Sequence, residues 1–256
     1  IAQPVGVPVV LASASTFGVF GGSAGMTNQG LLTVVDGDIG TTAVSTAVTG
    51  FHSSVDCTYT ETGSNEGAVL GSINTAPPQP TVACATEGTA ATFLIATAAR
   101  ADALTAYNTL AGLPGGPDPG AGNLANLVLT PGVYTAAGGT FMIQGGDLTL
   151  DAQGDPNAVF VFQMASSLTV GGPGAAFPQS VILINGAQPG NVFWQVGTAA
   201  TINAGGGGTM AGTMITQSGA SISTDGNVTV VTVNGRVISL GASVTLVNTV
   251  INVPSL

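Results

Sequence analysis

Short apolar segments alternate with corners of glycine and other small residues along most of this chain. From about residue 131 the pattern repeats as a strand, a corner, a second strand and a turn. The first strands are PGVYTA (131–136), NAVFVFQM (157–164), NVFWQV (191–196), AGTMITQ (211–217) and NGRVISL (234–240). The second strands are GTFMIQG, SSLTVGG, TAATINAG, GASISTDG and GASVTLVN. Segments this short and this rich in glycine and β-branched residues predict strands rather than helices.

Each second strand has a central residue between neighbours that are mainly apolar, and in most strands this central residue carries a hydroxyl. Their alignment predicts one column of residues, namely Met142, Thr169, Thr201, Ser223 and Thr245. Because alternate residues of a strand point to opposite faces, we expect the neighbours inside and the column outside. Repeats that cannot bury their own apolar face do so by stacking into a solenoid. The prediction is a mainly β protein, a β-solenoid or β-helix.

The N-terminal part repeats the same pattern, and a helix interrupts it. The N-terminal copies are FGVFGG (17–22), GMTNQG (25–30, centred on Thr27), LTVVDGDIG (32–40) and TAVTGF (46–51). An apolar stripe predicts one helix over 88–112, with Leu94, Ala98, Ala101, Leu104, Tyr107 and Ala111 on its buried face and Gly112 and Pro114 ending it. At about 1.5 Å per residue this helix reaches roughly 35 Å. Six or seven coils stacked at about 4.8 Å reach a similar length, so we expect the helix to lie along the stack.

The remaining segment, 51–85, contains both cysteines and the sequence APPQP. We expect a loop or cap that protects one open end of the stack, with the main run of coils over 123–256 and the whole chain, 1–256, as one domain. A disulfide between Cys57 and Cys84 in an exported protein is the favoured state of the cysteines, and two buried free thiols are the alternative. With one histidine, His52, the chain offers no metal site.

Charge and hydropathy exclude several classes of partner. The chain has 2 basic residues, none of them lysine, against 12 acidic ones, for a net charge of −10. Phosphate binding needs clustered basic side chains, so no nucleic-acid partner is expected. No apolar run approaches the roughly 18 residues of a membrane helix, so we expect a soluble protein without membrane insertion. The N-terminal segment has no basic region, which indicates a mature chain, secreted and with its signal peptide already removed.

Candidate catalytic groups are few. Asp36 with Asp38, and Asp151 with Asp155, are carboxylate pairs that acid–base chemistry or Ca²⁺ could use, but turn formation explains them more simply. The run Gly205–Gly208 lacks the lysine and helix of a phosphate loop. We therefore expect no enzymatic activity, no catalytic residues and no cofactor.

Several long motifs resemble the microbial ice-binding, or antifreeze, proteins. They are LTPGVY (129–134), LTLDAQGDPNAVFVFQ (148–163), VILINGAQPGNVFWQVG (181–197), VNGRVISL (233–240), DGDIGTT (36–42) and ADALTAYNTLAG (101–112). The resemblance covers nearly the whole chain. It implies a discontinuous, right-handed, triangular β-solenoid with one long α-helix packed alongside, which adsorbs to ice through one flat face and has neither enzymatic activity nor a cofactor.

Transferred to this chain, the resemblance places the ice face on the second strands. The family often has Thr-Ala/Gly-x-Thr/Asn there; TAAT (198–201) fits, SGAS (218–221) fits loosely and the Met142 coil departs. The expected ice-binding residues are Thr27, Met142, Ser167, Thr169, Ala199, Thr201, Asn203, Ser221, Ser223, Ser243 and Thr245. We expect thermal hysteresis, inhibition of ice recrystallisation, an ice crystal surface as the partner, and a monomer.

Two other interpretations of the same column exist. A hydroxyl column can be a packing ladder worth about 0.2–1 kcal/mol per cross-strand pair and nothing more. A flat face with Asp225 as its one charged residue also suits an adhesive or structural solenoid that binds a neutral glycan or a cell surface.

Overall fold

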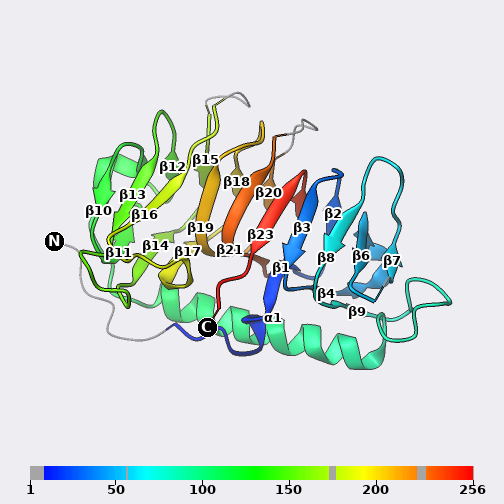
Figure 1. Ribbon diagram of the computed structural model, residues 1–256. Helices are drawn as coiled ribbons and strands as arrows, with labels where there is room; N and C mark the ends of the chain where they lie inside the picture. The colour runs from blue at the N-terminus through cyan, green and yellow to red at the C-terminus, as the bar shows by residue number, and fades with distance from the viewer. Residues whose placement is uncertain (1–8, 56, 173–176, 224–228, 256) are drawn as a thin grey trace.

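The computed structural model describes residues 9–55, 57–172, 177–223 and 229–255. In this part of the chain the strands stack as three sheets, and helix α1 (Ala90–Ala111) runs along one side of the stack (Figure 1). Four short 3-10 turns, η1 to η4, cover Ala12–Ala14, Ser45–Ala47, Pro119–Gly122 and Pro189–Asn191. Among the described residues, no helix has the length and apolar character needed to cross a membrane.

The largest sheet forms the wall under the helix and continues around one corner of the stack. Its 13 strands are β1 (Phe17–Gly21), β3 (Thr33–Asp36), β4 (Asp38–Val44), β6 (Phe51–Ser53), β7 (Thr58–Tyr59), β8 (Gly67–Val69), β9 (Ile73–Ala76), β11 (Gly132–Thr135), β14 (Phe160–Met164), β17 (Val192–Val196), β19 (Thr209–Thr216), β21 (Val231–Ser239) and β23 (Thr249–Asn252). A small sheet contains β10 (Val128–Leu129), β13 (Leu148–Asp151) and β16 (Val181–Ile184). Every predicted first strand lies in the largest sheet.

The predicted second strands form a sheet of their own. It contains β2 (Met26–Asn28), β5 (Val48–Thr49), β12 (Phe141–Ile143), β15 (Leu168–Val170), β18 (Ala200–Ile202), β20 (Ala220–Ile222) and β22 (Val244–Leu246). Their spatial order is β12-β15-β18-β20-β22-β2-β5, with all neighbours parallel. We call this layer the seven-stranded sheet.

The stack is discontinuous in sequence. The last C-terminal strands pair with the first N-terminal ones: β21 with β1, β22 with β2, and β23 with β3. Figure 1 shows this junction, where the red end of the chain lies beside its blue beginning. The chain therefore builds the far coils first, crosses the molecule through α1, and returns coil by coil to its own start.

Large apolar side chains stack in register inside the solenoid. Tyr134, Phe162 and Trp194 occupy matching positions of β11, β14 and β17. Their rings lie face to face, with centroids 5.4 Å apart for the first pair and 4.1 Å for the second. The buried Trp194 indole donates a 2.9 Å hydrogen bond from Nε1 to the carbonyl of Ala211. The ring stack fixes neighbouring coils against sliding, because stacked rings lose contact when either strand shifts.

Helix α1 packs through a face other than the predicted one. The residues it buries are Thr92, Ala96, Ala99, Ala103, Ala106, Tyr107 and Leu110. Of the predicted stripe only Tyr107 is among them, whereas Leu94 is 68% exposed and Leu104 is 40% exposed. The sheet itself supplies the bulk, with Phe20, Phe193 and Ile238 facing the helix. Small helix residues can lie close to such a surface, so the alanines face inward and the larger side chains outward.

Both ends of α1 are satisfied by hydrogen bonds. The helix begins after Thr89, whose side chain accepts a hydrogen bond from the Thr92 amide in a capping box. At the other end the Gln163 side chain, on β14, donates from Nε2 to the carbonyls of Leu110 (2.7 Å) and Leu113 (3.0 Å). Carbonyls of a last helical turn need such partners. The helix is thus anchored to the sheet by polar as well as apolar contacts.

Buried asparagines hold the corners beside the seven-stranded sheet. Asn203 is 1% exposed and has a left-handed backbone, with φ of 45°. Its Nδ2 donates to the carbonyls of Gln179 (2.9 Å) and Gly207 (2.8 Å), and its Oδ1 accepts from the Gln179 amide (3.0 Å). Asn28 and Asn248 make comparable side-chain bonds to the backbone of neighbouring corners. Asn203 is therefore a corner residue, and its predicted place on an exposed face is wrong.

Replacing Asn203 by alanine should destabilise the fold. The substitution leaves one amide and two carbonyl groups of a buried corner without partners, which costs about 1–3 kcal/mol. The exposed Asn252, whose side chain donates a 2.8 Å hydrogen bond to the Asn234 side chain, is the matched control, and Asn252→Ala should change the free energy of unfolding little. Urea unfolding measures both variants. An equal loss of unfolding free energy in the two variants would show that the buried corner bonds of Asn203 stabilise the fold no more than an exposed side-chain bond does.

The segment 51–85 forms β6 to β9 at one end of the stack. β8 pairs with β3, and β9 pairs with β4, so part of the segment continues the coils. β6 and β7 form an antiparallel pair at the outer end of the largest sheet. The disulfide between Cys57 and Cys84 is present, with the two Cα atoms 5.2 Å apart, as predicted. That the segment protects the end of the stack against association stays a prediction.

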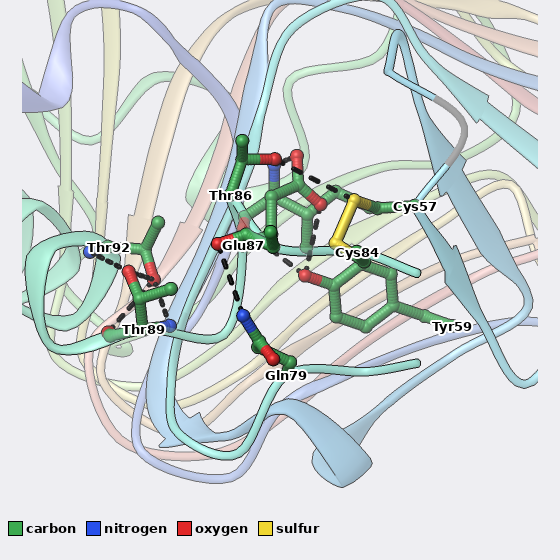
Figure 2. Close-up of a disulfide and its surroundings, with 10 residues drawn as sticks. Cys57, Tyr59, Gln79, Cys84, Thr86, Glu87, Thr89 and Thr92 are labelled. Atoms are coloured by element: carbon green, nitrogen blue, oxygen red, sulfur yellow. Dashed lines mark hydrogen bonds between the residues drawn. A yellow bond between two sulfur atoms is a disulfide. The ribbon is translucent and has the colours of Figure 1, made fainter. Parts of the chain in front are cut away.

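A buried carboxyl lies beside this disulfide (Figure 2). Glu87 is 2% exposed, and it accepts hydrogen bonds from the Ile73 amide (3.0 Å) and the Tyr59 hydroxyl (3.1 Å). Burial raises the pKa of Glu87 above its ordinary value, and burial together with the neighbouring Glu87 charge raises the pKa of Tyr59. Folding therefore favours the protonated form of Glu87 more than the unfolded chain does.

The Glu87 pKa predicts the sign of a pH effect. Because the folded pKa is raised, the contribution of this group to stability is complete below about pH 4.5 and is lost as the pH rises through the folded pKa. Glu87→Gln should therefore match the wild type near pH 4 and be the more stable protein at pH 8. Thermal unfolding across this range measures the difference, with the exposed Glu66→Gln as control. A wild type that gains on Glu87→Gln as the pH rises would contradict the assignment.

Candidate ice-binding face

The central residues of the seven-stranded sheet form one straight column. In spatial order they are Met142, Thr169, Thr201, Ser221, Thr245, Thr27 and Thr49, each in register with the next. In the three-residue strands the centre is partly exposed and both neighbours are buried. The neighbours point into the core, so the column points outward. We call these seven residues the central column.

The predicted alignment of one strand was wrong by two residues. Ser221, not Ser223, lies in register with Thr201 and Thr245. Ser223 is 1% exposed and has a left-handed backbone, with φ of 51°, past the end of β20. Ser221 and Ser223 lie on either side of Ile222, so strand alternation alone does not distinguish them; the strand ends at Ile222, which the sequence does not reveal. Ser223 therefore does not lie on the exposed face.

A second column flanks the first. It consists of the residues two positions before each member of the central column: Thr140, Ser167, Ala199, Gly219, Ser243, Gly25 and Ala47. All are partly or fully exposed except the two glycines, Gly25 and Gly219, which are buried. Backbone hydrogen bonds connect these positions to the adjacent strand, for example from the Leu168 amide to the Ala199 carbonyl (3.2 Å). The predicted residues Ser167, Ala199 and Ser243 lie here, partly or fully exposed. We call this row the flanking column.

The sequence prediction missed part of this surface. Thr49 continues the central column, and its Oγ1 donates a 3.3 Å hydrogen bond to Thr27 Oγ1. Its segment, TAVT (46–49), carries the same Thr-Ala-x-Thr pattern as TAAT (198–201), which could have identified it. Thr198 and Ser218 are also exposed. They lie in neighbouring coils, and the Ser218 amide donates a 2.9 Å hydrogen bond to the Thr198 carbonyl. The central column ends at Met142. On its other side, Met142 pairs with Asn123 through one isolated β-bridge.

Neither column contains a charged residue, so the surface they share is electrically neutral. Asp225, the one charge that the sequence placed near this face, lies outside the described residues. The basic residues are elsewhere: Arg236 is 1% exposed and donates to the carbonyls of Ser15 and Pro254. Burial lowers the pKa of Arg236 to about 10. Arg100 donates from Nε to the Leu240 carbonyl beside the helix.

The groups that could serve catalysis or metal binding have structural roles. Asp151 accepts bonds from the Gln153 amide and the Asn185 side chain, both 2.8 Å, in a turn. Among the described residues, one group of possible metal ligands lies within 4.8 Å, formed by Cys57, Cys84 and Glu87. Its two sulfur atoms are bonded to each other, which removes the thiolates that a metal would need.

Three stacked sheets with a discontinuous strand order, one flanking helix and a neutral hydroxyl-bearing face define a discontinuous β-solenoid. A sequence profile described as ice-binding-like matches residues 20–252. The chain belongs to this ice-binding family, which is not a family of enzymes.

Relatives of the chain are named ice-binding proteins. An ice-binding protein of Nostoc sp. (strain HG1) is 37% identical over 196 residues, which are 77% of this chain and 58% of that protein. Ice-binding protein 1 of Shewanella frigidimarina is 40% identical over 154 residues, 57% of this chain and 16% of the relative. The match thus spans 58% of the first relative's length and 16% of the second's, both less than two thirds.

Solved structures confirm the predicted β-solenoid with a helix alongside. The ice-binding protein 1 domain of Shewanella frigidimarina superposes with a TM-score of 0.75 at 27% identity, covering 98% of this chain and 99% of that one. An ice-binding protein from an Arctic yeast, described as having antifreeze activity, gives a TM-score of 0.72 at 28% identity, with 97% and 95% coverage.

Proposed function

We propose that this protein binds ice through the central and flanking columns of the seven-stranded sheet. The observation that carries the proposal is the register: seven consecutive strands present one outward residue each in a single line, and none of these residues is charged. The names of the relatives support the same ligand.

The geometry suits a lattice of water. Neighbouring strands lie about 4.8 Å apart, and outward residues along one strand lie roughly 6.6 Å apart, so the columns form a two-dimensional grid. Threonine has a stiff side chain, so holding it in one rotamer loses little entropy. Each hydroxyl gains little by bonding to ordered rather than liquid water, so many such contacts must act together. A straight, flat array meets that requirement.

The absence of charge serves the same end. A carboxylate or guanidinium organises water into a tight hydration shell that does not fit a crystal lattice, whereas a methyl group beside a hydroxyl leaves the water layer free to adopt lattice spacings. Thr27, Thr169, Thr201 and Thr245 each offer this pair of groups at the central position. The face can therefore bind an ordered water layer without imposing a hydration shell that conflicts with the ice lattice.

Further features follow from this proposal. Adsorption of the face to ice blocks crystal growth, which gives thermal hysteresis and inhibits recrystallisation. The protein acts as a non-catalytic monomer without a cofactor. The disulfide between Cys57 and Cys84 suits an oxidising compartment, which supports a secreted protein.

Replacing Thr201 by tyrosine tests the face. A large ring at the centre of the array lifts the flat surface off the crystal, so thermal hysteresis should fall by most of its wild-type value while unfolding stays unchanged. Thr105→Tyr, on the exposed side of α1, is the matched control and should retain full activity. Equal activity of all three proteins would place the ice contact elsewhere. Retention on a neutral polysaccharide without any ice shaping would favour the adhesive function instead.

A substitution at Met142 should raise thermal hysteresis instead of lowering it. It is the one member of the central column without a hydroxyl or β-branch, and it lies at the end of the array. Met142→Thr should give a modest gain in thermal hysteresis, since it extends the threonine column by one strand. The crystal-growth assay that serves Thr201→Tyr measures this gain. No gain, with the fold intact, would mean that the active surface ends at Thr169.

A further inference from the structure

The outermost strand of the proposed face has support on one side only within its sheet. β5 is the last strand of the seven-stranded sheet, and its sheet partner is β2, through Met26 with Val48 and Thr27 with Thr49. An edge strand this short has few bonds to fix it. The position of Thr49 therefore depends on what holds the chain just after it.

The bonds that follow Thr49 come from the cap segment and from a corner asparagine. The Gly50 amide donates to the carbonyls of Tyr59 (2.7 Å) and Thr60 (3.2 Å). The Gly50 carbonyl accepts a 3.0 Å bond from Asn28 Nδ2. Gly50 has a φ of 78°, and a Cβ there would lie 2.5 Å from the Asn28 carbonyl oxygen. The turn from β5 into β6 is thus fixed tightly, and it is fixed against Tyr59.

Tyr59 is itself held from two directions. Its hydroxyl donates to Glu87 Oε2 at 3.1 Å, while Glu87 Oε1 accepts from the Ile73 amide at 3.0 Å. Two residues before it, Cys57 is bonded to Cys84. Tyr59 and Glu87 are both at least 98% buried. Figure 2 shows the Tyr59 ring next to the disulfide, with its hydroxyl directed toward Glu87. We call Tyr59, Glu87 and the disulfide the cap cluster.

We propose that the cap cluster positions Thr49 and so adds the last strand to the ice-binding face. The inference rests on the proposed function, since it assigns Thr49 a role in the same surface. Tyr59, Glu87 and the two cysteines are positioning residues: they touch no ice and act through the Gly50 turn. The cap segment then has a task in ice binding beyond closing the end of the stack.

A double-mutant cycle tests this proposal. Thr49→Ala removes the last hydroxyl, Tyr59→Phe removes the bond to Glu87, and Cys57→Ser with Cys84→Ser removes the disulfide. If the cap cluster acts through Thr49, either cap variant should lower thermal hysteresis by about the same fraction as Thr49→Ala, and combining the two should lower it no further. Thr169→Ala, at the distant end of the column, is the control and should add its full effect to each cap variant.

Hydrogen exchange supplies a second readout on the same proteins. The cap variants should exchange the Gly50 amide faster, while the Val170 amide stays protected. Tyr59→Phe keeps the ring and the backbone carbonyl, so it remains informative if the cysteine variant does not fold. Additive losses for Thr49 and the cap, or cap variants with full activity and an exposed Gly50 amide, would overturn the proposal. A wild type without ice activity would instead refute the proposed function, and that outcome is distinct.

Discussion

The parallel, in-register pairing of very short strands is the constraint on which the rest of this structure depends. Side chains alternate between the two sides of a strand, so a slip of one residue would exchange the core and the surface of a whole coil. The central column exists only because β12 to β5 keep one register across seven strands. The stacked rings of Tyr134, Phe162 and Trp194, one sheet away, hold neighbouring coils to the same register.

Two further devices keep the coils aligned. Buried asparagines such as Asn28 and Asn203 bond to the backbone at the corners, where the chain leaves the regular ladder. Helix α1 crosses several coils and bonds to them through Gln163 and Arg100. Both devices place polar side chains against backbone carbonyls, so they stabilise one arrangement of the coils through directional bonds. A flat outer face is a consequence of this internal order.

The sequence predicts the architecture well, because the apolar periodicity that builds the coils is a local signal. The strands, the flanking helix and the disulfide are all found as expected. Details that depend on where a strand ends or on residue size were predicted less well. Ser221 and Ser223 both flank the apolar Ile222 at the same alternation phase, and the sequence does not reveal that β20 ends at Ile222, so the alternation alone allows Ser223 where the structure has Ser221 in register. The helix buries Ala96 and Ala103 instead of Leu94 and Leu104, because the bulk comes from the sheet, which the helix sequence alone does not reveal.

The central claim, that the outward column of the seven-stranded sheet is the surface that meets ice, can be tested most directly by watching adsorption. Because the chain contains no lysine, an amine-reactive dye labels the wild type and a Ser221→Asp variant at the N-terminal amino group alone. When a single ice crystal is grown into each solution, the account predicts that the wild type stains defined crystal planes and the variant, with a charge in mid-column, leaves the ice dark. Identical staining by the two proteins would contradict it.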